Sequence, residues 1–253
     1  MAFIQFHFFS QSLGMQSEAY VIIPQKRTSG QIGLETKSEG DKYKCLYLLH
    51  GLSDDHTAWM RRTSIERYAE KYGICVVMPC VHRSFYLNLS GDRNYYTLVA
   101  DELPSLVSEF FNISNNKDDN FIAGLSMGGY GALKIAMREK DKFAAAAGLS
   151  SVTEMLTPER LEFGQQLLGT VDSISPSDDL FYISEKMIKP EDAPRMFMAV
   201  GTDDFVYPEN IRFKNHLISH GFDLKFIEAP GDHSWDFWDK YIQIALEWML
   251  ENK

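Results

Sequence analysis

The sequence predicts a single α/β domain with a mostly parallel sheet and helices on both faces. Six apolar runs have the length of strands and little polar alternation, which indicates strands buried on both sides: 45–50, 74–79, 121–126, 143–150, 196–201 and 224–230. Helix-like segments separate most of these runs, as is typical of parallel sheets. The chain has 253 residues, a length that needs no second domain.

The N-terminal strands and the helices complete this pattern. Between residues 3 and 8, phenylalanine and isoleucine alternate with polar residues, as in a half-buried strand, and a second strand is expected at 17–24. We expect these two strands to pair antiparallel at the edge of the sheet. Residues 25–44 are expected to form a loop. The expected helices cover 64–72, 98–111, 128–139, 209–220 and 235–251.

Composition and charge exclude several classes of partner. The net charge of −10 disfavours nucleic acids and anionic membranes, because both bind clusters of Lys and Arg. No run approaches the ~18 apolar residues that span a bilayer, and the N-terminus lacks the pattern of a signal peptide, so we expect a cytoplasmic protein. Cys45, Cys75 and Cys80 are too few for a disulfide framework and match no zinc spacing. We expect the first two to be buried thiols.

A serine between glycines is the first sign of chemistry. Gly124-Leu125-Ser126-Met127-Gly128 lies between an expected strand and an expected helix, and in that setting G-x-S-x-G predicts a nucleophile elbow. The sharp turn exposes the serine hydroxyl and requires small residues two positions before and after it. The alternative interpretation is a plain Gly/Ser turn that caps the helix.

A serine hydroxyl needs a base beside it and an acid that orients the base. The sequence offers both beyond the last two expected strands, where open α/β sheets build their sites: Asp203 and Asp204 follow one strand, and Asp232 and His233 follow the other. We assign His233 as general base and acid, with Asp204 as its partner. Spacing alone leaves Asp203 open. Asp232 is a weaker candidate, because adjacent side chains in a loop rarely face one another.

The tetrahedral intermediate of acyl transfer needs two backbone donors. We expect one to be the N–H of Met127, directly after the serine. The other is expected to be the N–H of Leu52, in the loop after the strand 45–50, where Gly51 allows close approach. We interpret His50 as a structural hydrogen-bonding residue rather than a catalyst.

Other residues are candidates for the substrate pocket or for a metal site. Trp59 and Tyr86 follow strand ends on the expected active face, so we name them as substrate-binding residues, with core packing as an equal alternative. The segment 153–194 contains four prolines and interrupts the alternation of strands and helices, which indicates a helical insertion over the active site, a candidate lid. His216 and His220 have the i, i+4 spacing of zinc ligands, but no third ligand is apparent, and we expect surface histidines and no metal.

Six motifs together resemble the esterase D group of α/β-hydrolases. They are "LLHGLSDDHTAW", "RSFYLN", "YYTLVADELPSLV", "GLSMGGYGALKIA", "GTDDFVYPEN" and "GDHSWDFW", in the family's order from about Cys45 to Trp238. The group includes S-formylglutathione hydrolases, feruloyl and acetyl-xylan esterases, and mycolyltransferases. The chain is most similar to the small bacterial tributyrin esterases of this group.

The resemblance implies an α/β-hydrolase fold, a Ser126–Asp204–His233 triad and an oxyanion hole formed by the Leu52 and Met127 amides. It also implies a carboxylesterase that hydrolyses short acyl esters through an acyl-enzyme, without a cofactor. Because the family contains oligomers, a dimer or tetramer is expected.

One departure from the family bears on the substrate. S-formylglutathione hydrolases have a sequence resembling "SGLTC" where this chain has "HGLSD", which argues against glutathione thioesters as the main substrate. Acetylated sugars and cinnamoyl or feruloyl esters remain alternative substrates, and acyl transfer to an alcohol acceptor uses the same residues. A different class of protein, a non-catalytic binding protein on a hydrolase scaffold, usually lacks the serine or the histidine.

Overall fold

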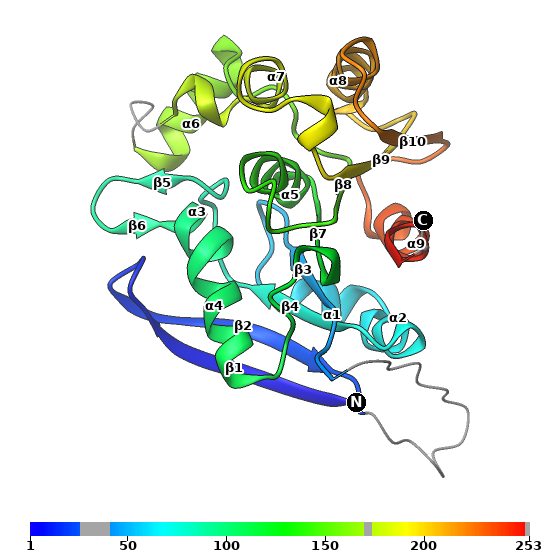
Figure 1. Cartoon of the computed structure of the whole chain (residues 1–253). Helices are drawn as coiled ribbons and strands as arrows, with labels where there is room; N and C mark the ends of the chain where they lie inside the picture. The colour runs from blue at the N-terminus through cyan, green and yellow to red at the C-terminus, as the bar shows by residue number, and fades with distance from the viewer. Residues whose placement is uncertain (26–40, 170–173, 251–253) are drawn as a thin grey trace.

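An eight-stranded sheet forms the centre of the computed structural model, which describes residues 1–25, 41–169 and 174–250 (Figure 1). Its strands are β1 (Ala2–Ser10), β2 (Met15–Ile23), β3 (Cys45–Leu49), β4 (Cys75–Pro79), β7 (Asn120–Leu125), β8 (Ala145–Leu149), β9 (Arg195–Gly201) and β10 (Leu224–Ala229). A hairpin of β5 (Asn88–Leu89) and β6 (Arg93–Asn94) lies apart from this sheet. The hairpin was not predicted, because two-residue strands show no periodicity.

The sheet has the order β1-β2-β4-β3-β7-β8-β9-β10. The pairs β1–β2 and β2–β4 are antiparallel, and all later neighbours are parallel. The predicted parallel sheet with an antiparallel N-terminal edge is therefore confirmed. Most of the loop predicted at 25–44 lies outside the described residues.

Helices cover both faces of the sheet (Figure 1). Successive side chains of a strand point to opposite faces, so Tyr47 and Leu49 of β3 belong to one core, and Leu46 and Leu48 to the other. This double burial explains the continuous apolar runs. The helices of the first core include α3 (Tyr95–Thr97), α4 (Leu103–Phe110), α5 (Met127–Arg138) and α8 (Tyr207–Ser219). Those of the second are α1 (Ala58–Arg62), α2 (Ile65–Tyr72) and α9 (Trp235–Leu250).

The helix predicted at 98–111 contains a π-helical turn. Helix α3 continues into the π-helix Leu98–Glu102 and then into α4. Pro104 has no amide hydrogen to bond the carbonyl of Ala100, four residues earlier, so the regular ladder is interrupted there. The Lys142 ammonium donates a hydrogen bond to that carbonyl instead, at 3.0 Å.

The segment predicted as a helical insertion forms short helices between β8 and β9. Proline occupies the first position of three of them, where a missing amide hydrogen costs nothing. Helix α7 and the following π-turn pack beside α5. The described elements are α6 (Pro158–Leu168), the 3-10 helices Pro176–Asp178 and Pro190–Asp192, α7 (Leu180–Tyr182) and the π-turn Ile183–Met187.

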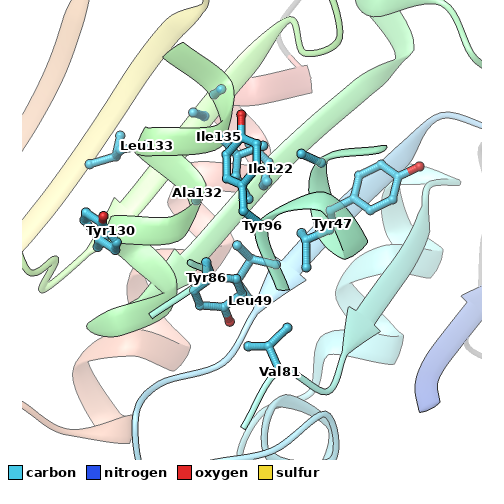
Figure 2. Close-up of a cluster of buried hydrophobic side chains, with 14 of the residues drawn as sticks. Tyr47, Leu49, Val81, Tyr86, Tyr96, Ile122, Tyr130, Ala132, Leu133 and Ile135 are labelled. Carbon is cyan, nitrogen blue, oxygen red and sulfur yellow. The ribbon is translucent and has the colours of Figure 1, made fainter. Parts of the chain in front are cut away.

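Helix α5 is buried from Met127 to Met137 and packs tightly on the sheet. Figure 2 shows its Tyr130 and Leu133 in one cluster with Leu49 of β3 and Tyr86. A Cβ at position 131 would overlap the ring of Tyr86, so the glycine there permits this close packing. The start of α5 is consequently held in a fixed position relative to β3.

A buried ion pair joins α5 to the insertion. The fully buried Lys134 donates hydrogen bonds to the carbonyl of Tyr86, at 2.8 Å, and to Oδ1 of Asp178, at 3.4 Å. The Tyr130 hydroxyl donates to the carbonyl of Asp178, at 2.6 Å. Burial lowers the pKa of Lys134 to about 8, although the Asp178 carboxylate opposes this shift.

Replacing the counter-charge of Lys134 should destabilise the protein. We expect Asp178→Asn to lower the free energy of unfolding by about 3 kcal/mol, measured by urea denaturation, because it leaves a buried ammonium unpaired. The loss should shrink as the pH rises toward about 8. Without Asp178, the pKa of the native lysine falls further below its ordinary value, so the variant gives up this proton at a lower pH than the wild type does, whereas the pKa in the unfolded chain is the ordinary 10.5.

Asp192→Asn is the matched control. Asp192 accepts a hydrogen bond from Lys140 at 2.9 Å, but both side chains are largely exposed. Its replacement should change the free energy of unfolding by less than about 1 kcal/mol. Equal losses in the two variants would show that the Lys134 pair has no special importance.

Candidate active site

Ser126 lies in a strained turn between β7 and α5. Its backbone has φ 53° and ψ −117°, a conformation that is costly for a residue with a side chain. A Cβ at Gly124 would overlap the carbonyl group of Gly128, and a Cβ at Gly128 would overlap the carbonyl oxygens of Leu49 and His50. Glycine is therefore required on both sides of the serine, and the geometry is that of a nucleophile elbow.

The structure brings Ser126, His233 and Asp204 together from three loops that follow parallel strands. His233 Nε2 lies 3.0 Å from Ser126 Oγ. His233 Nδ1 lies 2.9 and 3.0 Å from the two carboxylate oxygens of Asp204. The imidazole therefore lies within hydrogen-bond distance of the hydroxyl and of the carboxylate at once.

The carboxylate of Asp204 is fully buried and remains acidic. Burial alone would raise its pKa, but hydrogen bonds from His233, the Val206 amide and the Ser150 hydroxyl lower the pKa below its ordinary value. The Val206 amide is 3.0 Å from Oδ1. Asp204 is thus ionised at neutral pH, and its negative charge lies beside the imidazole.

Asp203 and Asp232, the other acids considered from the sequence, have different surroundings. The side chain of Asp203 is exposed, and its amide donates to the carbonyl of Gly231 at 2.9 Å. The carbonyl of Asp232 accepts from the amide of Ser234 at 3.0 Å. The backbones of these two acids therefore hold the two loops in place, while the side chain of Asp204 meets the imidazole.

The two predicted oxyanion donors belong to the elbow itself and to the loop that lies against it. Met127 is the first residue of α5, so its amide has no carbonyl partner within the helix. Leu52 follows Gly51 in the loop after β3. A Cβ at Gly51 would lie 3.8 Å from the Cβ of Ser126, which places this loop directly against the serine.

Trp59 and Tyr86 lie in the core and are fully buried, so neither side chain is accessible to a substrate in this structure. Trp59 Nε1 donates to the carbonyl of Leu49 at 3.0 Å, and the Tyr86 hydroxyl donates to the carbonyl of His50 at 2.9 Å. Both residues therefore brace the chain just before the Leu52 loop.

His50 is a structural residue, as predicted. Its Nε2 accepts a hydrogen bond from the amide of Val81, at 3.1 Å, and its Nδ1 is 2.7 Å from the carbonyl of Gly51. Burial lowers the pKa of His50 to about 4, so the ring is neutral at physiological pH. The neutral ring joins the Leu52 loop to the chain that follows β4.

Sequence reasoning missed Ser150. Strands β7 and β8 end in the same tetrapeptide, Ala-Gly-Leu-Ser, in register side by side, and both serines have positive φ. Trp238 Nε1 donates to Ser150 Oγ at 3.1 Å, and Ser150 in turn bonds Asp204. The repeated tetrapeptide was a signal in the sequence that could have identified this residue.

Phe205 was also missed. It follows Asp204 directly, is 70 % exposed, and has its ring centroid 4.4 Å from that of His233. An exposed aromatic ring beside the imidazole is available to a bound molecule.

Other sequence predictions concern thiols, histidines and membranes. Cys45, Cys75 and Cys80 are free and buried. His216 Nε2 lies 3.0 Å from the hydroxyl of Ser184, and His220 is exposed. Within the described part of the chain, no helix combines the length and the apolar character needed to cross a bilayer.

A strained serine at the carboxyl edge of a parallel α/β sheet, with a histidine and an aspartate from the loops after the last two strands, defines an α/β-hydrolase of the esterase type. The chain belongs to the esterase family whose model, described as "Putative esterase", matches residues 10–249. The predicted fold and family are confirmed.

Similar proteins agree with this assignment. An acetyl esterase of Caldicellulosiruptor saccharolyticus is 30% identical, and the match covers 98% of each chain. Two Staphylococcus aureus structures each match 99% of this chain over 99% of their own length. They are the substrate-bound fluorophosphonate-binding serine hydrolase FphF, 36% identical with a TM-score of 0.87, and the S-formylglutathione hydrolase FrmB, 35% identical with a TM-score of 0.85. The protein is a serine carboxylic ester hydrolase.

Proposed function

We propose that Ser126, His233 and Asp204 perform the ester hydrolysis of this enzyme as nucleophile, general base and orienting acid. The observation that supports these roles most directly is the position of the imidazole, with Nε2 at 3.0 Å from the hydroxyl and Nδ1 at 2.9 Å from the carboxylate. No alternative acid is needed, because both close oxygens belong to Asp204.

In the first half of the proposed reaction, Ser126 Oγ attacks the ester carbonyl while His233 Nε2 takes its proton. The amides of Leu52 and Met127 donate hydrogen bonds to the oxyanion that forms. His233 then protonates the leaving alkoxide, and the acyl group stays on the serine. In the second half His233 activates a water molecule, which releases the acid and restores the hydroxyl.

The buried surroundings of Asp204 favour this sequence of proton transfers. The imidazolium that forms during attack lies beside an ionised carboxylate in a site of low polarity, where the attraction exceeds that in water. Ser150 donates a hydrogen bond to the carboxylate, and the Trp238 ring nitrogen in turn donates to the Ser150 hydroxyl. The carboxylate therefore orients the ring without taking up its proton.

We propose short acyl esters, acetyl esters in particular, as the substrates. The acetyl esterase at 30% identity supports this choice. FrmB, a similar protein titled S-formylglutathione hydrolase, makes glutathione thioesters the alternative to be tested. We propose that Phe205 contacts the substrate. Trp59 and Tyr86 have a structural role in this proposal, because they brace the Leu52 loop. The insertion 153–194 is proposed to cover the site. A dimer or tetramer stays a prediction.

Removal of the nucleophile tests the proposal. We expect Ser126→Ala to lower kcat for p-nitrophenyl acetate by roughly 10³–10⁶-fold and to abolish labelling by a fluorophosphonate probe, with the fold intact by circular dichroism. Ser151→Ala is the matched control, since the Ser151 hydroxyl is buried and has no hydrogen-bond partner among the described residues. Near wild-type turnover by Ser126→Ala would refute the assignment. A wild-type protein without turnover or labelling would favour a non-catalytic binding protein.

The choice of acid has its own test. Asp204→Asn should lower kcat by about 10³–10⁴-fold, because the amide favours the wrong tautomer of the imidazole. Asp203→Asn should change kcat by less than about threefold, because an exposed carboxylate contributes little to the electrostatic stabilisation of the imidazole. Steady-state rates of the two variants decide the matter, and a larger loss in Asp203→Asn would transfer the role to that residue.

A substrate panel tests the proposed ester class. With p-nitrophenyl esters from acetate to decanoate, kcat/KM should be highest for the shortest acyl groups and fall by about tenfold or more at octanoate. Methyl ferulate, an acetylated sugar and S-formylglutathione form the other arms. If kcat/KM is higher for one of these compounds than for p-nitrophenyl acetate, that compound would indicate the substrate class in place of short aliphatic esters. Ester products formed with an added alcohol would indicate acyl transfer.

A further inference from the structure

Three segments that are distant in the sequence bring an oxygen, a nitrogen and a sulfur ligand together. Glu18 lies on β2, His56 in the loop after β3, and Cys80 directly after β4. One ligand atom of each lies within 4.8 Å of the others. The sheet fixes two of them, because the amide of Cys80 donates to the carbonyl of Glu18 at 3.0 Å. The ring of His56 packs edge-on against Tyr20, with centroids 4.6 Å apart.

The ring nitrogen of His56 that faces this cluster has no hydrogen bond. His56 is 8% exposed, and its Nδ1 is buried without a hydrogen-bond partner among the described residues. Glu18 Oε1 is 3.6 Å away, which is too long for a hydrogen bond. Buried polar atoms are rarely left unpaired, because this costs about 1–3 kcal/mol. A ligand that accepts the lone pair of Nδ1 would remove this cost.

The separations suit a metal ion. The ligand atoms of a tetrahedral zinc site lie roughly 3.3–3.6 Å apart, given bonds of about 2.0–2.3 Å. Glu18 Oε1 and His56 Nδ1 are 3.6 Å apart, and the ligand atoms of all three residues lie within 4.8 Å of one another, so small side-chain rotations would bring them to these distances. A cavity of about 330 Å³, lined in part by Glu18, Cys80 and His82, gives ions and water access to the cluster.

We propose that Glu18, His56 and Cys80 bind a divalent transition-metal ion, with a water molecule as the fourth ligand. Thiolate and imidazole ligands select Zn²⁺, Co²⁺ or Cu²⁺ over Mg²⁺ and Ca²⁺, and Zn²⁺ suits a four-ligand set of this kind best. The Cys80 thiol releases its proton to solvent as the metal–sulfur bond forms. The thiolate and the Glu18 carboxylate together balance the two positive charges of the ion.

The ion stabilises the loop that carries Leu52. His56 lies four residues after Leu52, and the start of the same loop is already bonded to the chain after β4 through His50 and the Val81 amide. An ion bound by His56 at the other end of the loop would link that end to Glu18 of β2 and to Cys80 after β4. The binding itself does not depend on the proposed catalytic roles.

Cobalt spectroscopy and calorimetry test the site on the full-length protein, purified without a polyhistidine tag. Co²⁺ should give the near-ultraviolet charge-transfer band of a cobalt–thiolate bond together with the visible bands of tetrahedral Co²⁺. Zn²⁺ should displace Co²⁺ at one ion per chain. At Zn²⁺ about 100-fold above its Kd, Tm should rise by roughly 5–10 °C.

Variants separate this site from other metal-binding groups. Cys80→Ser should abolish the thiolate band and weaken Zn²⁺ binding by about a hundredfold or more, and Glu18→Gln by about tenfold or more. Cys75→Ser, which removes a buried thiol of β4, should leave the band and the affinity unchanged. His220→Gln should also leave them unchanged, although His216 and His220 form another pair of imidazoles.

Two results would overturn the proposal. One is Co²⁺ binding to the wild-type protein without a thiolate band, which needs no variant and so does not depend on the folding of Cys80→Ser. The other is loss of the ion in His220→Gln but not in Cys80→Ser or Glu18→Gln, which would place it at the paired surface histidines.

Discussion

The close approach of the Ser126 turn to the end of β3 is the constraint on which the rest of the site depends. Gly124 and Gly128 have no Cβ, so the turn can lie against the carbonyl groups of Leu49 and His50. Those two carbonyls also accept hydrogen bonds from Trp59 and Tyr86. A strained serine is stable only where its surroundings are this rigid, because the strain would otherwise relax. The same contact brings the loop after β3 beside the serine.

Several polar groups behind the site are buried in pairs or chains. Trp238 bonds Ser150, and Ser150 bonds Asp204, which meets the imidazole of His233. On the other side of the serine, the Lys134 ion pair holds α5 against the insertion. Burial strengthens each of these interactions, because little water competes, and it makes every unpaired member costly. The arrangement is therefore rigid, as preorganised catalysis requires.

The loop from His50 to His56 connects the proposed catalytic site to the proposed metal site. At its start, His50 accepts a hydrogen bond from Val81, and at its end His56 lies beside Glu18 and Cys80. Leu52 lies between these two anchors, so any ion that fastens His56 acts on the position of the Leu52 amide. The expectation of no metal was based on the spacing of the cysteines and of His216 and His220, and such spacing cannot detect ligands from three separate segments.

The sequence by itself determined the eight strands, the long helices and the turn at Ser126, because these follow from local periodicity and from glycines at fixed offsets. It could not detect the π-turn before Pro104 or the short hairpin, which lack periodicity. The spacing in the sequence left Asp203 open beside the assigned Asp204, and only the tertiary structure shows the Asp204 carboxylate at the imidazole and Trp59 and Tyr86 buried in the core. The physical reason is that two adjacent residues in a loop are almost equally far along the chain from the other motifs, but their side chains point in different directions. Those directions are set by packing between segments that are far apart in the chain.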